Sequence, residues 1–295
     1  MSKRLIFASC IAVSVAMPAS AANYVLTDGN STATISDING AIVWRVAQGG
    51  AAPASSPDNL FISNYLFRVG STAGERSIAA GLGTPTLAGQ SANGVSFRAA
   101  NASLSATLDW RLRGSASDAG RAVLVKSVTF TNLSSDALDF HLFDYSDHDI
   151  RFNPAAQADT ARLAGPGLIV TSSSTVPFSI VSRASVAPDR YQIDSFLPLY
   201  QALFLDSDGP TTLSNTPAPN GTFPTTPGDT AFAFQWSRTL APGASFSVSQ
   251  MAAFLPSAAV PEPASWGLMI AGFALMGGSL RSARGRRAGT LGAIG

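Results

Sequence analysis

Apolar and polar residues alternate along most of the chain between residues 22 and 257. Segments such as ASLSATLDWRLR, AVLVKSVTFTNLS and SFSVSQMAAFL place every second side chain on one face, which is typical of strands with one buried face. Gly, Pro, Asn, Asp or Ser separate these segments, as expected for turns. No segment outside the two ends shows a helical period. The pattern predicts an all-β domain at residues 22–257, an antiparallel β-sandwich of roughly a dozen strands.

Three turns are predicted from their residues. Asn39 and Gly40 lie between two alternating segments, where this dipeptide favours a tight type I′ hairpin. Residues 132–136 separate two further strand segments, and Pro242 and Gly243 separate the last two. Each turn is expected to be followed by a return strand.

Composition argues against nucleic-acid binding and against stabilisation by disulfides. The chain has 295 residues, a formal net charge of +1 and only 13% charged residues, so no basic face for nucleic acid is indicated. Its one cysteine, Cys10, lies in the apolar N-terminal segment. Once that segment is removed, the mature chain has no disulfide and no thiolate metal site, and we expect its core alone to stabilise it.

The N-terminus has the composition of a secretory signal peptide. Lys3 and Arg4 precede the apolar residues 5–17, and the small residues Ala19 and Ala21 form a cleavage site. We expect a signal peptide at residues 1–21, cut after Ala21 or one residue later. The chain would then be exported by the general secretion machinery and cut by signal peptidase.

A second apolar segment lies near the C-terminus. Residues 264–280 carry no charge and, as a helix, would span about 26 Å, the lower limit for crossing a bilayer. Four arginines follow it: Arg281, Arg284, Arg286 and Arg287. The positive-inside rule keeps these arginines in the cytoplasm. The sequence therefore predicts a C-terminal transmembrane helix in the inner membrane, with the β domain on the outside.

The residues just before this segment carry a family resemblance. Pro261, Glu262 and Pro263 hold the backbone extended, and Trp266 follows at the expected membrane interface. Together with the apolar run and the arginines, they resemble the PEP-CTERM sorting signal of Gram-negative bacteria, here residues 258–295. The resemblance implies recognition by exosortase, which cuts near the tripeptide. A protein that is transiently anchored and then reaches the cell surface or the medium is expected.

One group of residues has metal-binding character. Asp144, Asp147 and Asp149 follow one another closely, and hard oxygen ligands at such spacings can bind Ca²⁺. The twelve-residue loop of an EF-hand with its closing Glu is absent. We expect a strand end whose aspartates face solvent, with no bound metal, and keep a calcium site as the alternative.

No catalytic constellation is found in the sequence. His141 and His148 are the only histidines, and they are expected on opposite faces of a strand without the motif of a serine hydrolase or a zinc protease. No phosphate-binding or dinucleotide loop is present, so no cofactor is expected. Glu75, the only glutamate of the body, is assigned to a turn.

The three tryptophans of the body, Trp44, Trp110 and Trp236, lie within strand patterns and are expected in the core rather than on a sugar-binding surface. The leading hypothesis is therefore a protein without enzymatic activity at the cell surface or in the extracellular matrix. The sorting-signal family implies a setting of exopolysaccharide and biofilm. The alternative is a secreted carbohydrate-binding or carbohydrate-active protein, which would need two carboxylates or exposed aromatic rings.

Overall fold

The structure is a computed structural model that describes residues 21–47, 51–116, 120–150, 159–205 and 209–256. These residues all belong to one compact unit within Met1–Pro256. The predicted signal peptide, apart from Ala21, lies outside the described residues, as does the whole predicted sorting signal with its helix. None of the helices that the structure describes is long and apolar enough to cross a bilayer.

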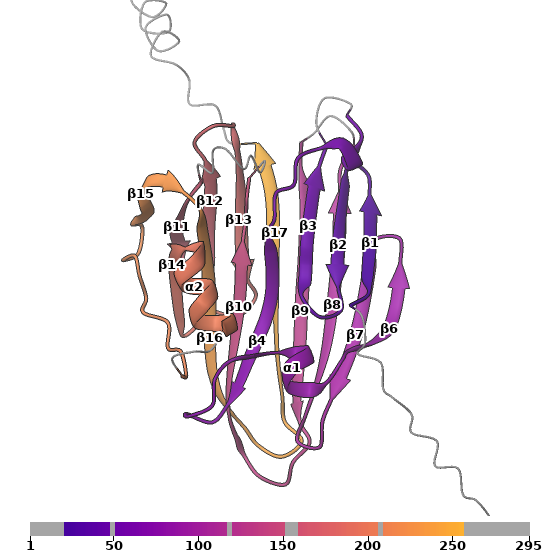
Figure 1. Ribbon diagram of the computed structural model, residues 1–295, viewed down its shortest axis with the longest axis vertical. Coiled ribbons are helices and arrows are strands. Elements are labelled where there is room, and N and C mark those ends of the chain that lie inside the picture. Colours follow the sequence, from indigo (N-terminus) through magenta and orange to yellow (C-terminus); the bar gives the residue numbers. More distant parts are fainter. Residues whose placement is uncertain (1–20, 48–50, 117–119, 151–158, 206–208, 257–295) are drawn as a thin grey trace, which may run out of the picture. The chain divides into compact units, whose positions relative to one another are not determined.

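Two antiparallel sheets form the described part of the chain, which confirms the predicted all-β class (Figure 1). Sheet A contains, in spatial order, β1 (Asn23–Asp28), β2 (Ser31–Ser36), β3 (Gly40–Val46), β4 (Ile62–Val69), β10 (Leu138–Asp147), β16 (Thr230–Leu240) and β14 (Arg190–Ser195), with β5 (Arg76–Ser77) paired to β4. Sheet B contains β15 (Thr222–Gly228), β11 (Asp159–Gly165), β12 (Leu168–Ser173), β13 (Phe178–Ala184), β17 (Ser245–Pro256), β9 (Ala122–Asn132), β8 (Leu104–Gly114), β7 (Gly94–Ala100) and β6 (Thr86–Ser91).

The described residues thus form seventeen strands, more than the predicted dozen. The additional strands are ones in which alternation is weak or absent. All six residues of β6 are exposed, β5 has two residues, and β15 contains two prolines. Such edge strands form through backbone hydrogen bonds to a neighbour, so they leave little trace in the hydrophobic pattern.

The described residues also form short helices that the sequence pattern did not predict. They are η1, a 3₁₀ helix (Pro53–Ser55), α1 (Ile78–Leu82), α2 (Phe196–Tyr200) and η2, a π-helix (Gln201–Leu205). None is long enough to establish a 3.6-residue period. α2 and η2 lie on the outer face of sheet A, where Leu199 and Leu203 pack against Phe143 and Leu66 (Figure 1). This face therefore has a second, smaller core.

The main core lies between the sheets. In β9 every second residue is buried, as the alternation predicts. Trp44, Trp110 and Trp236 expose no more than 2% of their surface, which confirms their assignment to the core. Each buried side chain of this size contributes about 1.5–3 kcal/mol or more through the hydrophobic effect.

Neutral hydroxyl groups pair across the outer face of sheet B. Thr129 Oγ1 lies 2.8 Å from Ser247 Oγ on the neighbouring strand, and Thr131 Oγ1 lies 2.7 Å from Ser245 Oγ. Farther along the sheet, Ser172 Oγ on β12 lies 3.0 Å from Ser179 Oγ on β13. These pairs take the place that ion pairs occupy on many protein surfaces.

The turn at Gly40 joins β2 to β3, but it is not of type I′. Ser36 pairs with Gly40, so three residues form the loop, and only Gly40 has a positive φ, of 72°. A type I′ turn needs two such residues. A Cβ at Gly40 would lie 2.4 Å from the backbone oxygen of Ser63, so glycine is also required by the close approach of β4.

The two other predicted turns are present, but each crosses from one sheet to the other. Residues 133–137 join β9 of sheet B to β10 of sheet A, and residues 241–244 join β16 of sheet A to β17 of sheet B. Asn132 ties the two turns together. Its Nδ2 donates to the backbone oxygens of Leu240, at 2.8 Å, and Asp136, at 2.7 Å.

Replacing Asn132 with Ala should lower the free energy of unfolding by about 2 kcal/mol, because two carbonyl groups would lose their donor in a buried place. Urea unfolding measures the change. Asn93→Ala, in an exposed turn, is the matched control and should have little effect. Equal stability of both variants would show that Asn132 does not hold the turns.

Candidate functional site

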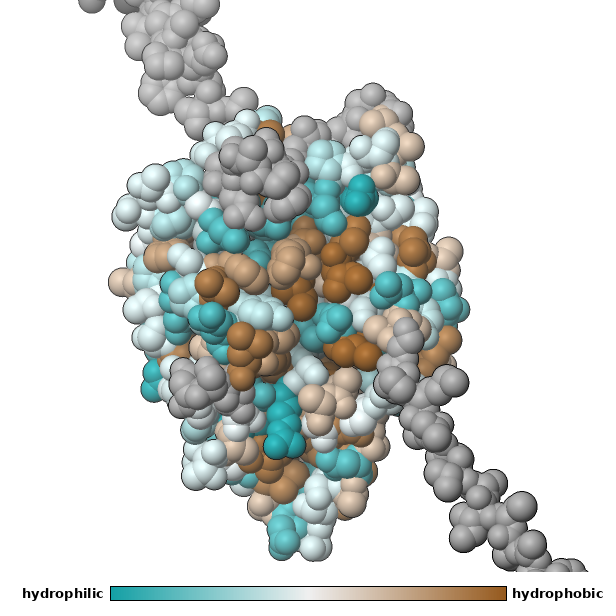
Figure 2. All heavy atoms as spheres, in the orientation of Figure 1, coloured by the Kyte–Doolittle hydropathy of each residue, from teal (hydrophilic) through white to brown (hydrophobic). Residues whose placement is uncertain are grey.

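Sheet A opens between β3 and β4. Among the residues described in these two strands, Ala41 and Ser63 alone pair across this junction. A pocket of about 460 Å³ lies there, which we call the acidic pocket. It is lined by Asn39, Ile42, Asp58, Leu60, Phe61, Ile62, Asp149 and Tyr200. The face of the molecule drawn in Figure 2 shows apolar side chains interspersed with polar ones over its middle.

Asp58 is held rigidly at the acidic pocket. Its Oδ1 accepts hydrogen bonds from the backbone N–H groups of Trp44, at 2.8 Å, and Asn59, at 2.9 Å, with a longer one from Leu60. The other carboxylate oxygen of Asp58, Oδ2, takes no part in these three hydrogen bonds. Burial raises the pKa of Asp58 above its usual value, although the backbone donors act in the opposite direction. The side chain is thus a fixed carboxyl group with one oxygen that remains available.

Aromatic side chains form a band beside this carboxyl group. The Phe61 ring is 51% exposed and meets Phe196 edge-on, with ring centroids 5.1 Å apart. Tyr200 lies 5.2 Å from Phe196 and stacks on Phe204 at 4.6 Å. These four rings, Phe61, Phe196, Tyr200 and Phe204, are called the aromatic band. Two of them line the acidic pocket, so a flat apolar surface lies next to a carboxylate.

Three aspartates meet at the same end of sheet A. Asp147 ends β10, Asp149 follows it, and Asp229 lies between β15 and β16. One carboxylate oxygen from each lies within 4.8 Å of the other two. Asp147 and Asp149 are buried, and Asp229 is half-buried. We call these three the carboxylate cluster, and its Asp149 also lines the acidic pocket.

Burial and mutual repulsion disfavour negative charge in this region. They raise the pKa of Asp149 to about 7, and burial raises that of the adjacent Asp159 to about 7. The pKa of Asp147 is also raised, by burial first and then by the other aspartates. A raised carboxyl pKa stabilises the fold below the usual value of 3.8, and this stabilisation is lost as the pH rises through about 7. In the ionised state the cluster therefore needs a source of positive charge.

Of the three aspartates considered for calcium, Asp144 lies apart from the others. It faces the space between the sheets, where its Oδ1 lies 2.5 Å from Lys126 Nζ. Both side chains are fully buried. Burial raises the pKa of Asp144 to about 6 and lowers that of Lys126, while their attraction works against both changes. Asp147 and Asp149 do come together, but Asp229 is the third carboxylate beside them.

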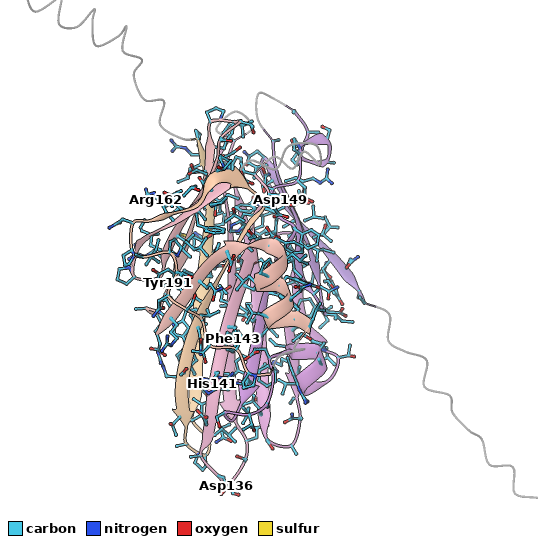
Figure 3. The ribbon with its side chains drawn as sticks, turned by 60° about the vertical axis from the view of Figure 1, so that its left-hand side comes forward. Asp136, His141, Phe143, Asp149, Arg162 and Tyr191 are labelled. Atoms are coloured by element: carbon cyan, nitrogen blue, oxygen red, sulfur yellow. The ribbon has the colours of Figure 1, made fainter. Side chains whose placement is uncertain are left out.

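The expectation that these aspartates face solvent is wrong, since Asp144, Asp147 and Asp149 expose 6% of their surface or less. Figure 3 shows Asp149 toward one end of the sandwich and Asp136 at the opposite end. β10 ends at Asp147 beside the segment that carries Asp229, so its acidic residues are enclosed. Sequence reasoning also missed Asp58, Asp159 and Asp229, which lie in separate segments between strand patterns.

The histidines and Glu75 lie in other surroundings. His141 Nδ1 lies 2.9 Å from Ser237 Oγ, near the surface of sheet A. His148 is buried, and burial lowers its pKa to about 3, so it is neutral at physiological pH. Glu75 is not simply a turn residue: it is buried and pairs with Arg68 at 2.9 Å.

Comparison with known proteins identifies the C-terminal segment. Residues 259–287 match the PEP-CTERM protein-sorting motif. The chain carries a PEP-CTERM sorting signal. This confirms the predicted resemblance and implies export, membrane-associated sorting and processing by exosortase. Among curated proteins, no match to the chain was found.

The fold is similar to that of several solved structures. A putative aldose 1-epimerase from Escherichia coli K12 has a TM-score of 0.53 at 10% identity, covering 80% of this chain and 100% of its own. A galactose mutarotase-like protein from Lactobacillus casei has a TM-score of 0.50 at 11% identity, covering 79% and 100%. A bacterial glucoamylase in complex with acarbose has a TM-score of 0.50 at 7% identity, covering 80% of this chain and 34% of its own.

These similarities correct the expectation of a protein without enzymatic activity. The two sheets have a fold similar to those of the epimerase, the mutarotase-like protein and the glucoamylase, which the strand pattern alone did not distinguish from other sandwiches. At these identities the likeness concerns the fold. Any function must be argued from the residues of the site itself.

Lys126→Met should lower the free energy of unfolding by about 3–5 kcal/mol, because Asp144 would remain buried without its partner. The double variant Lys126→Met/Asp144→Val should recover most of this loss, since it removes both charges. Urea unfolding checks both values, with the exposed Arg111→Met as control. A double variant no more stable than Lys126→Met would contradict this account of the pair.

Proposed function

We propose that this PEP-CTERM protein is exported and acts on a saccharide that binds in the acidic pocket. The observation that carries the proposal is the meeting of two carboxyl groups, Asp58 and Asp149, with the exposed ring of Phe61 in one pocket of about 460 Å³. Sites for small ligands commonly combine an apolar lining with a few fixed polar groups. The fold of the epimerase, mutarotase-like and glucoamylase structures supports a sugar as the ligand.

Each side of the pocket would contact a different part of the sugar. The aromatic band, through Phe61 and Tyr200, offers ring surfaces to the C–H groups of a pyranose. Carboxylate oxygens accept hydrogen bonds from sugar hydroxyls. Asp58, fixed by backbone donors, would transfer the proton at the anomeric centre, and its raised pKa suits a group that must both take up and release a proton.

The reaction class that this arrangement serves is acid–base chemistry at an anomeric carbon. Interconversion of anomers begins with proton removal from the anomeric hydroxyl, and glycoside hydrolysis begins with protonation of the glycosidic oxygen. Both need a carboxyl group at the sugar, although hydrolysis needs two. The two carboxyl groups that line the acidic pocket are Asp58 and Asp149.

The setting of this activity would be outside the inner membrane. We propose that the signal peptide at residues 1–21 directs export and that the predicted C-terminal helix anchors the chain until exosortase cuts it. The mature protein would then meet exopolysaccharide at the cell surface or in the biofilm matrix. The sorting motif supports this location.

Asp58→Asn should reduce turnover about 100-fold or more, because general acid–base catalysis is lost while Asn Oδ1 still accepts the backbone hydrogen bonds. Anomer interconversion of α-D-glucose and α-D-galactose, followed by NMR, and release of reducing sugar from polysaccharides of the producing cell are the assays. Asp136→Asn, in an exposed turn at the opposite end, is the matched control.

Wild-type activity on any of these sugars that falls in Asp58→Asn and persists in Asp136→Asn supports the proposal. Unchanged turnover in Asp58→Asn would remove Asp58 from the mechanism. If the wild type neither binds nor converts any of the sugars, the proposed function is wrong.

Processing can be tested by intact-mass measurement of protein recovered from the cell surface and the medium. The mature chain should lack residues 1–21 and residues 266–295, because signal peptidase and exosortase remove them. In cells that lack exosortase, the C-terminal residues should remain. Retention of residues 266–295 in normal cells would contradict cleavage at the sorting signal.

A further inference from the structure

The carboxylate cluster contains buried oxygens that the described part of the chain leaves without a partner. Oδ1 of Asp147 and Oδ1 of Asp229 are both buried and accept no hydrogen bond. The neighbouring Asp159 differs, because its Oδ2 accepts from the N–H of Ile150 at 3.1 Å and the hydroxyl of Ser173 also acts on its carboxyl group. A buried acceptor without a donor costs about 1–3 kcal/mol, and more if it is charged.

The arrangement is more than a group of surface acids. Asp147 exposes only 2% of its surface, and its carboxylate oxygen points toward those of Asp149 and Asp229 within 4.8 Å. The hydroxyl of Tyr145, which is fully buried on the same face of β10, also has no hydrogen-bond partner. Tyr145 lies two residues before Asp147 on β10, so its side chain is on the same face of the strand as that of Asp147. Unsatisfied oxygens from several elements therefore converge on one place.

Among the described residues, no cationic side chain pairs with the carboxylate cluster. The Lys and Arg ion pairs found there go elsewhere: Lys126 pairs with Asp144, Arg68 with Glu75, and Arg238 with Asp189. Buried carboxyl groups either stay protonated or need positive charge beside them, and once this cluster ionises a bound cation would provide that charge.

We propose that Asp147, Asp149 and Asp229 bind one calcium ion at the wall of the acidic pocket. The donors are all oxygens, which suits hard cations. Calcium lies about 2.3–2.6 Å from its ligands, so oxygens on one ion can be up to about 5 Å apart, and the spacing of the cluster fits this limit. Calcium takes six to eight ligands, about half of which water or a ligand's hydroxyls would provide.

The ion would also face the sugar. Asp149 belongs both to the cluster and to the lining of the acidic pocket, so two hydroxyls of a bound saccharide could replace waters on the calcium. This second step rests on the proposed function, whereas the binding of calcium itself does not.

The first experiment uses calcium alone, without sugar. Isothermal titration of the purified protein with CaCl₂, after removal of metal by EDTA, should show one site per chain. The Tm should rise by about 5–10 °C at a calcium concentration a hundredfold above Kd. Asp147→Asn and Asp229→Asn should abolish the heat of binding and the Tm shift, and Asp136→Asn should retain both.

The stability of the variants in EDTA distinguishes loss of the ion from loss of the fold. Asp229→Asn removes one repelling charge, so its Tm in EDTA should equal or exceed that of the wild type. The proposal is overturned if calcium produces no Tm shift in the wild type, or if the shift survives in both Asp147→Asn and Asp229→Asn. Magnesium should give a smaller shift, because it demands a stricter geometry.

A second titration adds the saccharide found active, or the cell's own polysaccharide, in calcium and in EDTA. Binding that weakens at least tenfold in EDTA supports a direct contact between sugar and ion. Calcium binding without any sugar binding would refute the proposed function and leave the ion site standing. Sugar binding that is equal in calcium and EDTA, in a protein that does not bind calcium, would refute the ion site alone.

Discussion

The ion pair between Lys126 and Asp144 constrains the arrangement of the two sheets. Lys126 lies on β9 of sheet B and Asp144 on β10 of sheet A, and both are buried between the layers. Lys126 Nζ also donates to Ser63 Oγ on β4, at 2.7 Å. A buried charge without its partner would cost several kcal/mol, so a one-residue slip of β10, which turns Asp144 to the other face, is strongly opposed.

This constraint also determines what the outer face of β10 presents. Since successive side chains of a strand alternate, holding Asp144 inward turns Tyr145 and Asp147 outward. There they meet the segment that carries α2 and, at the end of the strand, Asp229. The buried ion pair thus lies on one face of β10, and the carboxylate cluster lies on the opposite face. The weak junction of β3 with β4 leaves the space beside the cluster open as a pocket.

Much of the fold could be predicted from alternation, but the site could be predicted only in part. Lys126 falls at an inward position of β9, between Leu124 and Val128, so the pattern already contained the signal that it is buried. Asp144 likewise follows the inward Phe140 and Leu142 of β10. Neither could be assigned to the other, because pairing across two sheets depends on topology rather than on the spacing of residues along the chain.

The same reason explains the residues that were missed. Asp58, Asp159 and Asp229 come from three loops or strand ends, and only the folded chain brings them to Asp147 and Asp149. The aromatic band was missed because α2 and η2 are too short to show a helical period. The sorting signal, in contrast, is read by an enzyme as a linear segment, so its residues could be recognised in order along the sequence.

The hydroxyl pairs on sheet B bear on the environment in which an exported domain works. Thr129 with Ser247 and Thr131 with Ser245 hold neighbouring strands through neutral groups. Dissolved ions screen attractions between exposed charges but not hydrogen bonds between alcohols. Changes of ionic strength therefore weaken exposed ion pairs more than these hydroxyl pairs. A surface built in this way keeps its cross-strand contacts through such changes.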